Sequence, residues 1–215
     1  MKHIKTICSG ILAGIIIGIG GLVSSVVSSN VLTISDKVLA AFLFSIGLLL
    51  ICIFGINLYT GKIGYVLDNK SSFLVDLGEM LVGNLIGASL MGLFVRGCSS
   101  QFNKAIVYLS SSCETKLNHP WYTALLLSIG CGMLVYLAVA IFKSEQHPVI
   151  RMVGLFMCVT VFVASGMAHI VAEMFYFVAA NKLSGDAILF LLIVLVGNSG
   201  GSIGLHALIK LINKK

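Results

Sequence analysis

The sequence has very little charge for its length. Only 10% of its 215 residues are Asp, Glu, Lys or Arg, whereas 58% are hydrophobic and the mean hydropathy is +1.06. A soluble domain usually has about 25% charged residues, because charge keeps its surface in water. A chain this poor in charge must contact another solvent over most of its area. The composition therefore excludes a soluble domain of any size and predicts an integral membrane protein surrounded by a lipid bilayer.

Cysteine and proline provide few constraints. The six cysteines give no disulfide framework, and no Cys/His cluster has metal-ligand spacing, so we expect neither a metal nor a cofactor. Four cysteines lie in apolar segments as packing residues, while Cys98 and Cys113 lie in a polar loop where they are free to pair. The two prolines, Pro120 and Pro148, lie at the edges of apolar segments. This argues against an aquaporin-type water or glycerol channel, which has paired Asn-Pro-Ala elements.

Long apolar segments make up most of the chain. A helix needs about 20 apolar residues to cross the hydrocarbon core, and runs of this length are too continuous for barrel strands. We therefore predict an all-α membrane protein with six transmembrane helices and one transmembrane channel domain over residues 1–215. The predicted spans are residues 7–28, 38–66, 75–95, 121–142, 149–179 and 187–211.

The basic residues predict the orientation. Six spans place both termini on one side, and nine of the 14 Lys and Arg residues fall on that side. The positive-inside rule then predicts cytoplasmic termini and a multi-pass protein of the cell inner membrane. The same rule explains the net charge of +6, so we expect no nucleic acid as a partner. The nine are Lys2, Lys5, Lys62, Lys70, Lys143, Arg151, Lys210, Lys214 and Lys215, and the other five are Lys37, Arg96, Lys104, Lys116 and Lys182.

Two spans contain matching interruptions. Residues 55–61 (Gly-Ile-Asn-Leu-Tyr-Thr-Gly) break the second span, and residues 164–169 (Ala-Ser-Gly-Met-Ala-His) break the fifth. Each break is followed at a comparable distance by Val-Gly-Asn, which contains Asn84 in the third span and Asn198 in the sixth. This order indicates an inverted repeat with halves of about residues 1–100 and 115–215, whose interrupted helices meet near the midplane and form a substrate path. Gly10, Gly14 and Gly18 of the first span predict a helix-packing face.

Several polar side chains lie at these interruptions or close to them in the sequence. His169 follows the break in an otherwise apolar run, and an intramembrane histidine normally faces protein or a water-filled cavity. It is either a proton-exchanging group or a hydrogen-bonded core residue. Glu173 lies one helical turn further on, either as its carboxylate partner or in an ion pair. Thr60 is the matching hydroxyl in the second span, whereas Asn57, Asn84 and Asn198 are expected mainly to fix helices and loops, with a relay role left open.

These motifs resemble the formate/nitrite transporter family over nearly the whole chain. Residues 162–169 (Phe-Val-Ala-Ser-Gly-Met-Ala-His) are similar to the signature of its fifth span, which ends in a central histidine. Residues 44–48 (Phe-Ser-Ile-Gly-Leu) and 58–61 (Leu-Tyr-Thr-Gly) are similar to its second-span elements, and the two Gly-Asn elements also match. The resemblance implies an aquaporin-like inverted repeat that assembles as a homopentamer, with one pore in each protomer.

The resemblance also implies roles for individual residues. Thr60 and His169 correspond to the pore centre, and Lys116 to a vestibule lysine that attracts anions. The constrictions correspond to two pairs, Phe44 with Phe162 on the outer side and Leu58 with Val135 on the inner side. Glu173 departs from the family, which usually has asparagine there, and Asn57 replaces a residue that is often acidic.

The expected function is therefore transport without catalysis. The family's cargoes are small monovalent anions of weak acids, such as formate, nitrite or hydrosulfide, which pass as the anion or as the neutral acid. A passive or proton-linked channel is the first reading, and a proton- or sodium-coupled secondary transporter that uses Glu173 is the alternative. An intramembrane enzyme with His169 and Glu173 as a pair lacks a nucleophile motif and a metal-ligand set.

Overall fold

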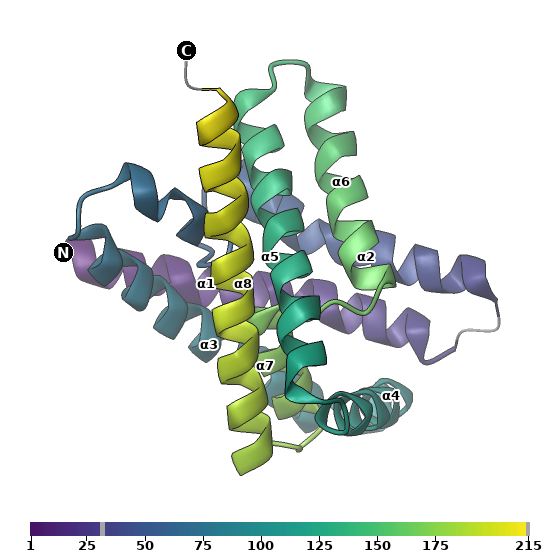
Figure 1. Ribbon diagram of the computed structural model, residues 1–215. Helices are drawn as coiled ribbons and strands as arrows, with labels where there is room; N and C mark the ends of the chain where they lie inside the picture. Colours follow the sequence, from purple (N-terminus) through teal and green to yellow (C-terminus); the bar gives the residue numbers. More distant parts are fainter. Residues whose placement is uncertain (31–32, 214–215) are drawn as a thin grey trace.

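The computed structural model describes residues 1–30 and 33–213, and within these ranges the chain is helical with no strand. Lys214 and Lys215, predicted on the side of the termini, lie outside the described residues. In Figure 1, α1, α2 and α3 run across the view, whereas α5, α6 and α8 run from its top toward its bottom. The helices are α1 (Lys2–Ser28), α2 (Ile34–Phe54), the 3-10 helix η1 (Ile63–Asp68), α3 (Phe73–Gly97), α4 (Ser99–Leu117), α5 (Trp121–Ser144), α6 (Pro148–Ala164), α7 (Ile170–Ala179) and α8 (Gly185–Ile212).

The apolar helices agree with the predicted spans. Among the described residues, α1, α2, α3, α5 and α8 are each long and apolar enough to cross a membrane. The fifth predicted span is two helices of 17 and 10 residues, α6 and α7, so the count of six crossings stays a prediction. The helices also leave large apolar side chains exposed, such as Leu12 on α1 and Leu192 on α8. Such surfaces suit lipid or a neighbouring subunit, and the chain is a multi-pass membrane protein.

The predicted polar loop around Cys98 and Cys113 was wrong, because this stretch forms helix α4. Its serines, asparagine and charged residues lower the hydropathy, but most of them are compatible with a helix. The buried face of α4 includes Ala105, Leu109 and Cys113. All six cysteines are free, so Cys98 and Cys113 do not pair.

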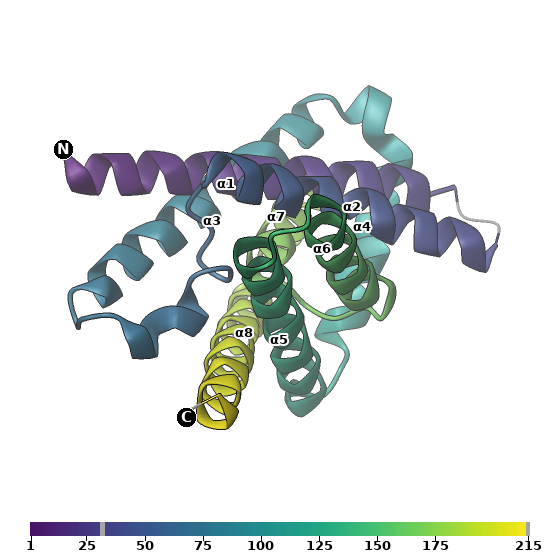
Figure 2. The same cartoon turned by 90° about the horizontal axis from the view of Figure 1, so that it is seen from above.

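Glycine allows two pairs of helices to touch at their backbones. A Cβ atom on Gly14 of α1 would lie 2.1 Å from the Asn84 carbonyl oxygen of α3, and one on Gly132 of α5 would lie 2.2 Å from the Asn198 carbonyl oxygen of α8. Gly10 and Gly18 also face α3, which confirms the packing face predicted for the first span. Figure 2 shows α5 and α8 side by side. A close backbone contact therefore joins α1 to α3 in the first half and α5 to α8 in the second half.

Ion pairs identify two ends of the molecule. At the end that carries the termini, Lys2 lies 2.9 Å from Asp76 of α3, and Lys210 lies 2.5 Å from Asp68 of η1. At the opposite end, Lys182 lies 2.7 Å from Glu114 of α4. We call these the termini end and the α4 end.

Asp68 ties η1 to α8 at the termini end. It lies 2.8 Å from His206 Nε2 as well as 2.5 Å from Lys210 Nζ. The hydrogen bond from Lys210, aided by the attraction of His206, lowers the pKa of Asp68 below its ordinary value. A lowered pKa in the folded state means that the link is fully formed above the ordinary Asp pKa and is lost only as the pH falls through the lower, folded value.

We expect Asp68→Asn to loosen η1, because a neutral amide cannot form the ion pair with Lys210 and binds His206 more weakly than a carboxylate does. Hydrogen exchange at pH 6 should be faster in η1 and unchanged in α5, whereas Asp186→Asn at the far end of α8 serves as the control. In the wild type, protection of η1 should persist below the ordinary Asp pKa of about 3.9. Equal exchange of η1 in the variant and the wild type would contradict the link.

Candidate functional site

Both interrupted spans break at a glycine in the left-handed region. Gly55 ends α2 with φ 64°, and Gly166 follows α6 with φ 69°. No atom lies within 4 Å of a Cβ placed on either residue, so conformation and not crowding requires glycine there. The chain then runs without regular helix until η1 in one half and until α7 in the other.

A buried asparagine holds the broken backbone in each half. The Asn84 amide donates to the carbonyls of Gly10 and Asn57, both at 2.9 Å, and its oxygen accepts from Tyr59 N at 2.8 Å. These bonds satisfy backbone groups that an interruption would otherwise leave unpaired in an apolar environment.

Asn198 makes the equivalent bonds in the second half. It donates to the carbonyls of Ser128 at 2.8 Å and Ala168 at 2.9 Å, and accepts from Ile170 N at 2.9 Å. The residue enclosed by the bonded backbone groups is Leu58 in the first half and His169 in the second. The two residues therefore occupy equivalent places in the repeat.

Thr60 and His169 meet where the interruptions converge. Thr60 Oγ1 lies 2.7 Å from His169 Nε2, and the two residues are 1% and 3% exposed. His169 Nδ1 accepts from Ala172 N at 3.3 Å and caps α7. A nitrogen that accepts from a backbone N–H carries no proton, so the neutral ring has its proton on Nε2 and donates it to Thr60. The hydroxyl hydrogen of Thr60 is then free to point elsewhere.

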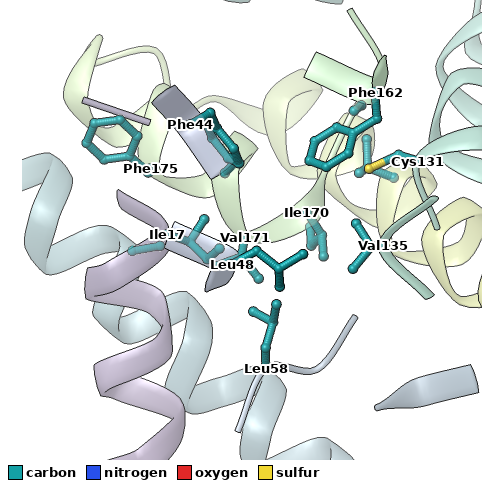
Figure 3. Close-up of a cluster of buried hydrophobic side chains, with 14 of the residues drawn as sticks. Ile17, Phe44, Leu48, Leu58, Cys131, Val135, Phe162, Ile170, Val171 and Phe175 are labelled. Carbon is teal, nitrogen blue, oxygen red and sulfur yellow. The ribbon is translucent and has the colours of Figure 1, made fainter. Parts of the chain in front are cut away.

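Apolar side chains surround this polar pair. The Phe44 and Phe162 rings meet edge to face with centroids 5.9 Å apart, and Phe162 lies 6.1 Å from the His169 ring. Leu58 and Val135 are also buried in the same core. Figure 3 shows the two phenylalanines above Leu48 and Ile170, with Leu58 below them. The four residues predicted as constrictions therefore lie in one buried apolar core, with Phe162 beside His169.

Cavities open toward both ends of the molecule. One of about 270 Å³, on the α4 side, is lined by Phe44, Phe162, His169, Glu173 and Lys116 among others. An adjoining one of about 370 Å³ also includes Lys116 and extends toward α4. On the other side of the core, a cavity of about 180 Å³ is lined by Leu58, Gly61, Lys62 and Lys143. The polar pair therefore lies between two vestibules.

Lys116 is not an isolated cation in its vestibule. Its Nζ donates to both carboxylate oxygens of Glu173, at 2.6 and 2.8 Å, and lies 5.0 Å from the centre of the Tyr176 ring. Glu173 is 1% exposed and the Lys116 side chain 20% exposed. The glutamate that departs from the family pattern thus neutralises the lysine expected to attract anions.

Two residues that support the site, Ser9 and Lys62, were not predicted to belong to it. Ser9 Oγ accepts from Asn57 N at 2.9 Å, and Asn57 Oδ1 accepts from Lys62 Nζ at 2.5 Å. Lys62 was predicted only as one of the basic residues that set the orientation in the membrane. Its place directly after Thr60-Gly61 is the signal that points to the vestibule. Within the described part of the chain, no group of three or more His, Cys, Asp or Glu side chains is placed to hold a metal ion.

Known proteins are similar to this chain in both sequence and fold. The profile of the family described as "Formate/nitrite transporter" matches residues 1–212. A probable formate transporter of Methanothermobacter thermautotrophicus is 27% identical over 209 residues, which cover 84% of this chain and 76% of that protein. A formate-nitrite transporter of Entamoeba histolytica is 26% identical over 196 residues, or 85% of this chain, and the match spans only 54% of that longer protein.

Two solved structures share the fold. A pentameric formate channel with formate bound superposes with a TM-score of 0.84 over 100% of this chain and 98% of that one, at 24% identity. An ion channel of the FNT family gives a TM-score of 0.85 over 98% and 90% of the two chains, at 21% identity. The interrupted helices described above thus belong to a known channel architecture.

Proposed function

Because this chain belongs to the formate/nitrite transporter family, we propose that it conducts small monovalent anions of weak acids, such as formate, nitrite or hydrosulfide, across the cytoplasmic membrane. The proposal includes a homopentamer with one path in each protomer, in line with the pentameric formate channel that shares the fold. It places the termini end in the cytoplasm, where the basic residues of that end satisfy the positive-inside rule.

The observation that carries the proposal is the buried Thr60–His169 pair between apolar constrictions. Its two atoms lie 2.7 Å apart with vestibules on both sides. The His169 ring donates from Nε2, so the Thr60 hydroxyl has its own hydrogen available, and no second partner for it occurs within residues 1–30 and 33–213. That hydroxyl is suited to donate to an oxygen or sulfur atom of the cargo.

The apolar constrictions favour the neutral form of the cargo. Moving an unpaired anion into an apolar environment costs many kcal/mol, whereas a small neutral acid passes far more easily. In the proposed path the anion enters a vestibule and takes a proton from water there, which leaves a hydroxide ion in that vestibule. The neutral acid, which Thr60 and His169 favour, then crosses Phe44 and Phe162 or Leu58 and Val135. On the α4 side, the anion competes with Glu173 for Lys116. Asn84 and Asn198 act as structural supports of the path.

We expect His169→Phe to lower formate flux at least about tenfold, equivalent to roughly 1.4 kcal/mol. The substitution leaves Thr60 without its partner and removes the cap of α7. Proteoliposomes are mixed with formate, nitrite or hydrosulfide while the internal pH is recorded. His169→Asn, which keeps a capping acceptor, separates loss of the cap from loss of the imidazole. Wild-type flux through an assembled His169→Phe protein would remove this residue from the mechanism.

The same vesicles test the alternative of coupled transport. Glu173 is a buried carboxylate that lines the same vestibule as His169, as a carrier site requires. A transporter coupled to sodium, or to more than one proton for each anion, accumulates cargo beyond the distribution set by the pH difference and the membrane potential. A passive path stops at the distribution set by the pH difference and the membrane potential.

A further inference from the structure

The vestibule at the termini end contains two lysines and no carboxylate. Lys62 follows the interruption of the second span, and Lys143 lies in the last turn of α5. Residues far apart in the sequence therefore present two positive charges to one cavity of about 180 Å³. The remaining lining is Ile51, Cys52, Gly55, Ile56, Leu58, Gly61, Val139 and Phe142.

Neither lysine is neutralised by an acidic side chain. Lys62 Nζ donates to the neutral Asn57 amide at 2.5 Å, and Lys143 Nζ lies 4.5 Å from the centre of the Tyr65 ring. Within residues 1–30 and 33–213, no carboxylate lies within 4.0 Å of either ammonium group. Asp76 attracts Lys62 only from a longer distance and is itself paired with Lys2. Because the two lysines repel each other, an anion between them would relieve the repulsion.

The opposite vestibule has a different charge balance. Its buried carboxylate, Glu173, takes up the charge of Lys116, and its other lining lysine, Lys37, is exposed to solvent. An exposed charge is screened by water and salt more strongly than one inside a cavity. At the termini end Lys143 is exposed like Lys37, whereas Lys62 is half-buried. The uncompensated positive charge next to the apolar core is therefore at the termini end.

We propose that Lys62 and Lys143 form a second anion-binding site, which takes a small monovalent anion on the termini side of Leu58. Each ammonium group has three N–H donors, so Lys62 can keep its bond to Asn57 and still donate to the anion. The site rests on the proposed function, since its ligand is the same cargo. Because of this site, the half-saturating anion concentration is lower at the termini side than at the α4 side.

Flux measured from each side separately tests the site. Right-side-out and inside-out membrane vesicles of an expression host take up radiolabelled formate, and protease access to an N-terminal tag reports which end faces outward. The variants are Lys62→Gln, Lys143→Gln and the double variant. Lys70→Gln is the matched control, because this lysine is exposed near the same end and does not line the cavity.

The half-saturating formate concentration at the termini side should rise at least about fivefold in the double variant, because two uncompensated charges are lost from a partly desolvated cavity. The value at the α4 side should change less than twofold, and Lys62→Arg should stay near the wild type. Should the double variant not assemble, the two single variants decide. Unchanged half-saturation at the termini side, with normal wild-type flux, would overturn the site alone. Absence of formate, nitrite and hydrosulfide flux in the wild type would overturn the proposed function.

Discussion

Replacing Lys116 with alanine is expected to lower the free energy of unfolding by about 3–5 kcal/mol, the usual cost of removing one partner from a buried ion pair. Glu173 is 1% exposed and both of its oxygens accept from Lys116, so the variant leaves a carboxylate in an apolar environment without its cation.

The matched variants make this prediction specific to the buried charge. Glu173→Gln should cost less, because the Lys116 side chain is 20% exposed and can turn toward water. The double variant Lys116→Met with Glu173→Gln should recover most of the loss, since no charge stays buried. The measurement is the thermal unfolding midpoint of the purified protein in detergent. Equal destabilisation by Lys116→Ala and Glu173→Gln would show that burial of the carboxylate does not determine the effect.

Adding one methyl group at Gly87 is expected to break the contact between α1 and α3. A Cβ atom there would lie 1.9 Å from the Ile11 carbonyl oxygen and 2.9 Å from Ile15 N, both of which are backbone atoms. Overpacking of a core usually costs about 1–3 kcal/mol even where side chains can adjust. Because a helix backbone cannot rotate away, Gly87→Ala should reach at least the upper end of this range and lower the yield of assembled protein.

The control lies nine residues earlier in the same helix. A Cβ atom on Gly78 meets nothing within 4 Å, so Gly78→Ala changes helix propensity without changing the contact. Size-exclusion chromatography and thermal unfolding of the two variants should therefore give opposite results, with loss for Gly87→Ala and wild-type behaviour for Gly78→Ala. Similar behaviour of the two variants would mean that α1 and α3 do not need this close approach.

Hydropathy and motif spacing were sufficient to predict the apolar helices, the two interruptions and the asparagines that follow them. These features are local, because apolar length, a glycine and a polar side chain inside an apolar run can be read within a single segment. The helix α4 was missed because its polar composition hides a helix that covers one end of the bundle.

The ion pair and the second vestibule depend on contacts that no single segment reveals. Glu173 and Lys116 are 57 residues apart, and the sequence assigned them separate roles, as a relay and as an anion attractor. Lys62 and Lys143 were predicted only as charges that set the orientation, because hydropathy does not show that α5 and the interruption of the second span enclose one cavity. Packing within the second half places Lys116 against Glu173, and packing between the halves places Lys62 and Lys143 at one cavity. The single sequence specifies neither.

The paired asparagines have a consequence for direction. Asn84 and Asn198 hold the two interruptions through the same set of backbone bonds, so the support at the centre of the path is alike when the molecule is turned upside down. A leucine in one half and a histidine in the other then make the two approaches chemically unlike. At the centre of the path, the difference between entry and exit therefore comes from side chains and not from the backbone bonds that hold them.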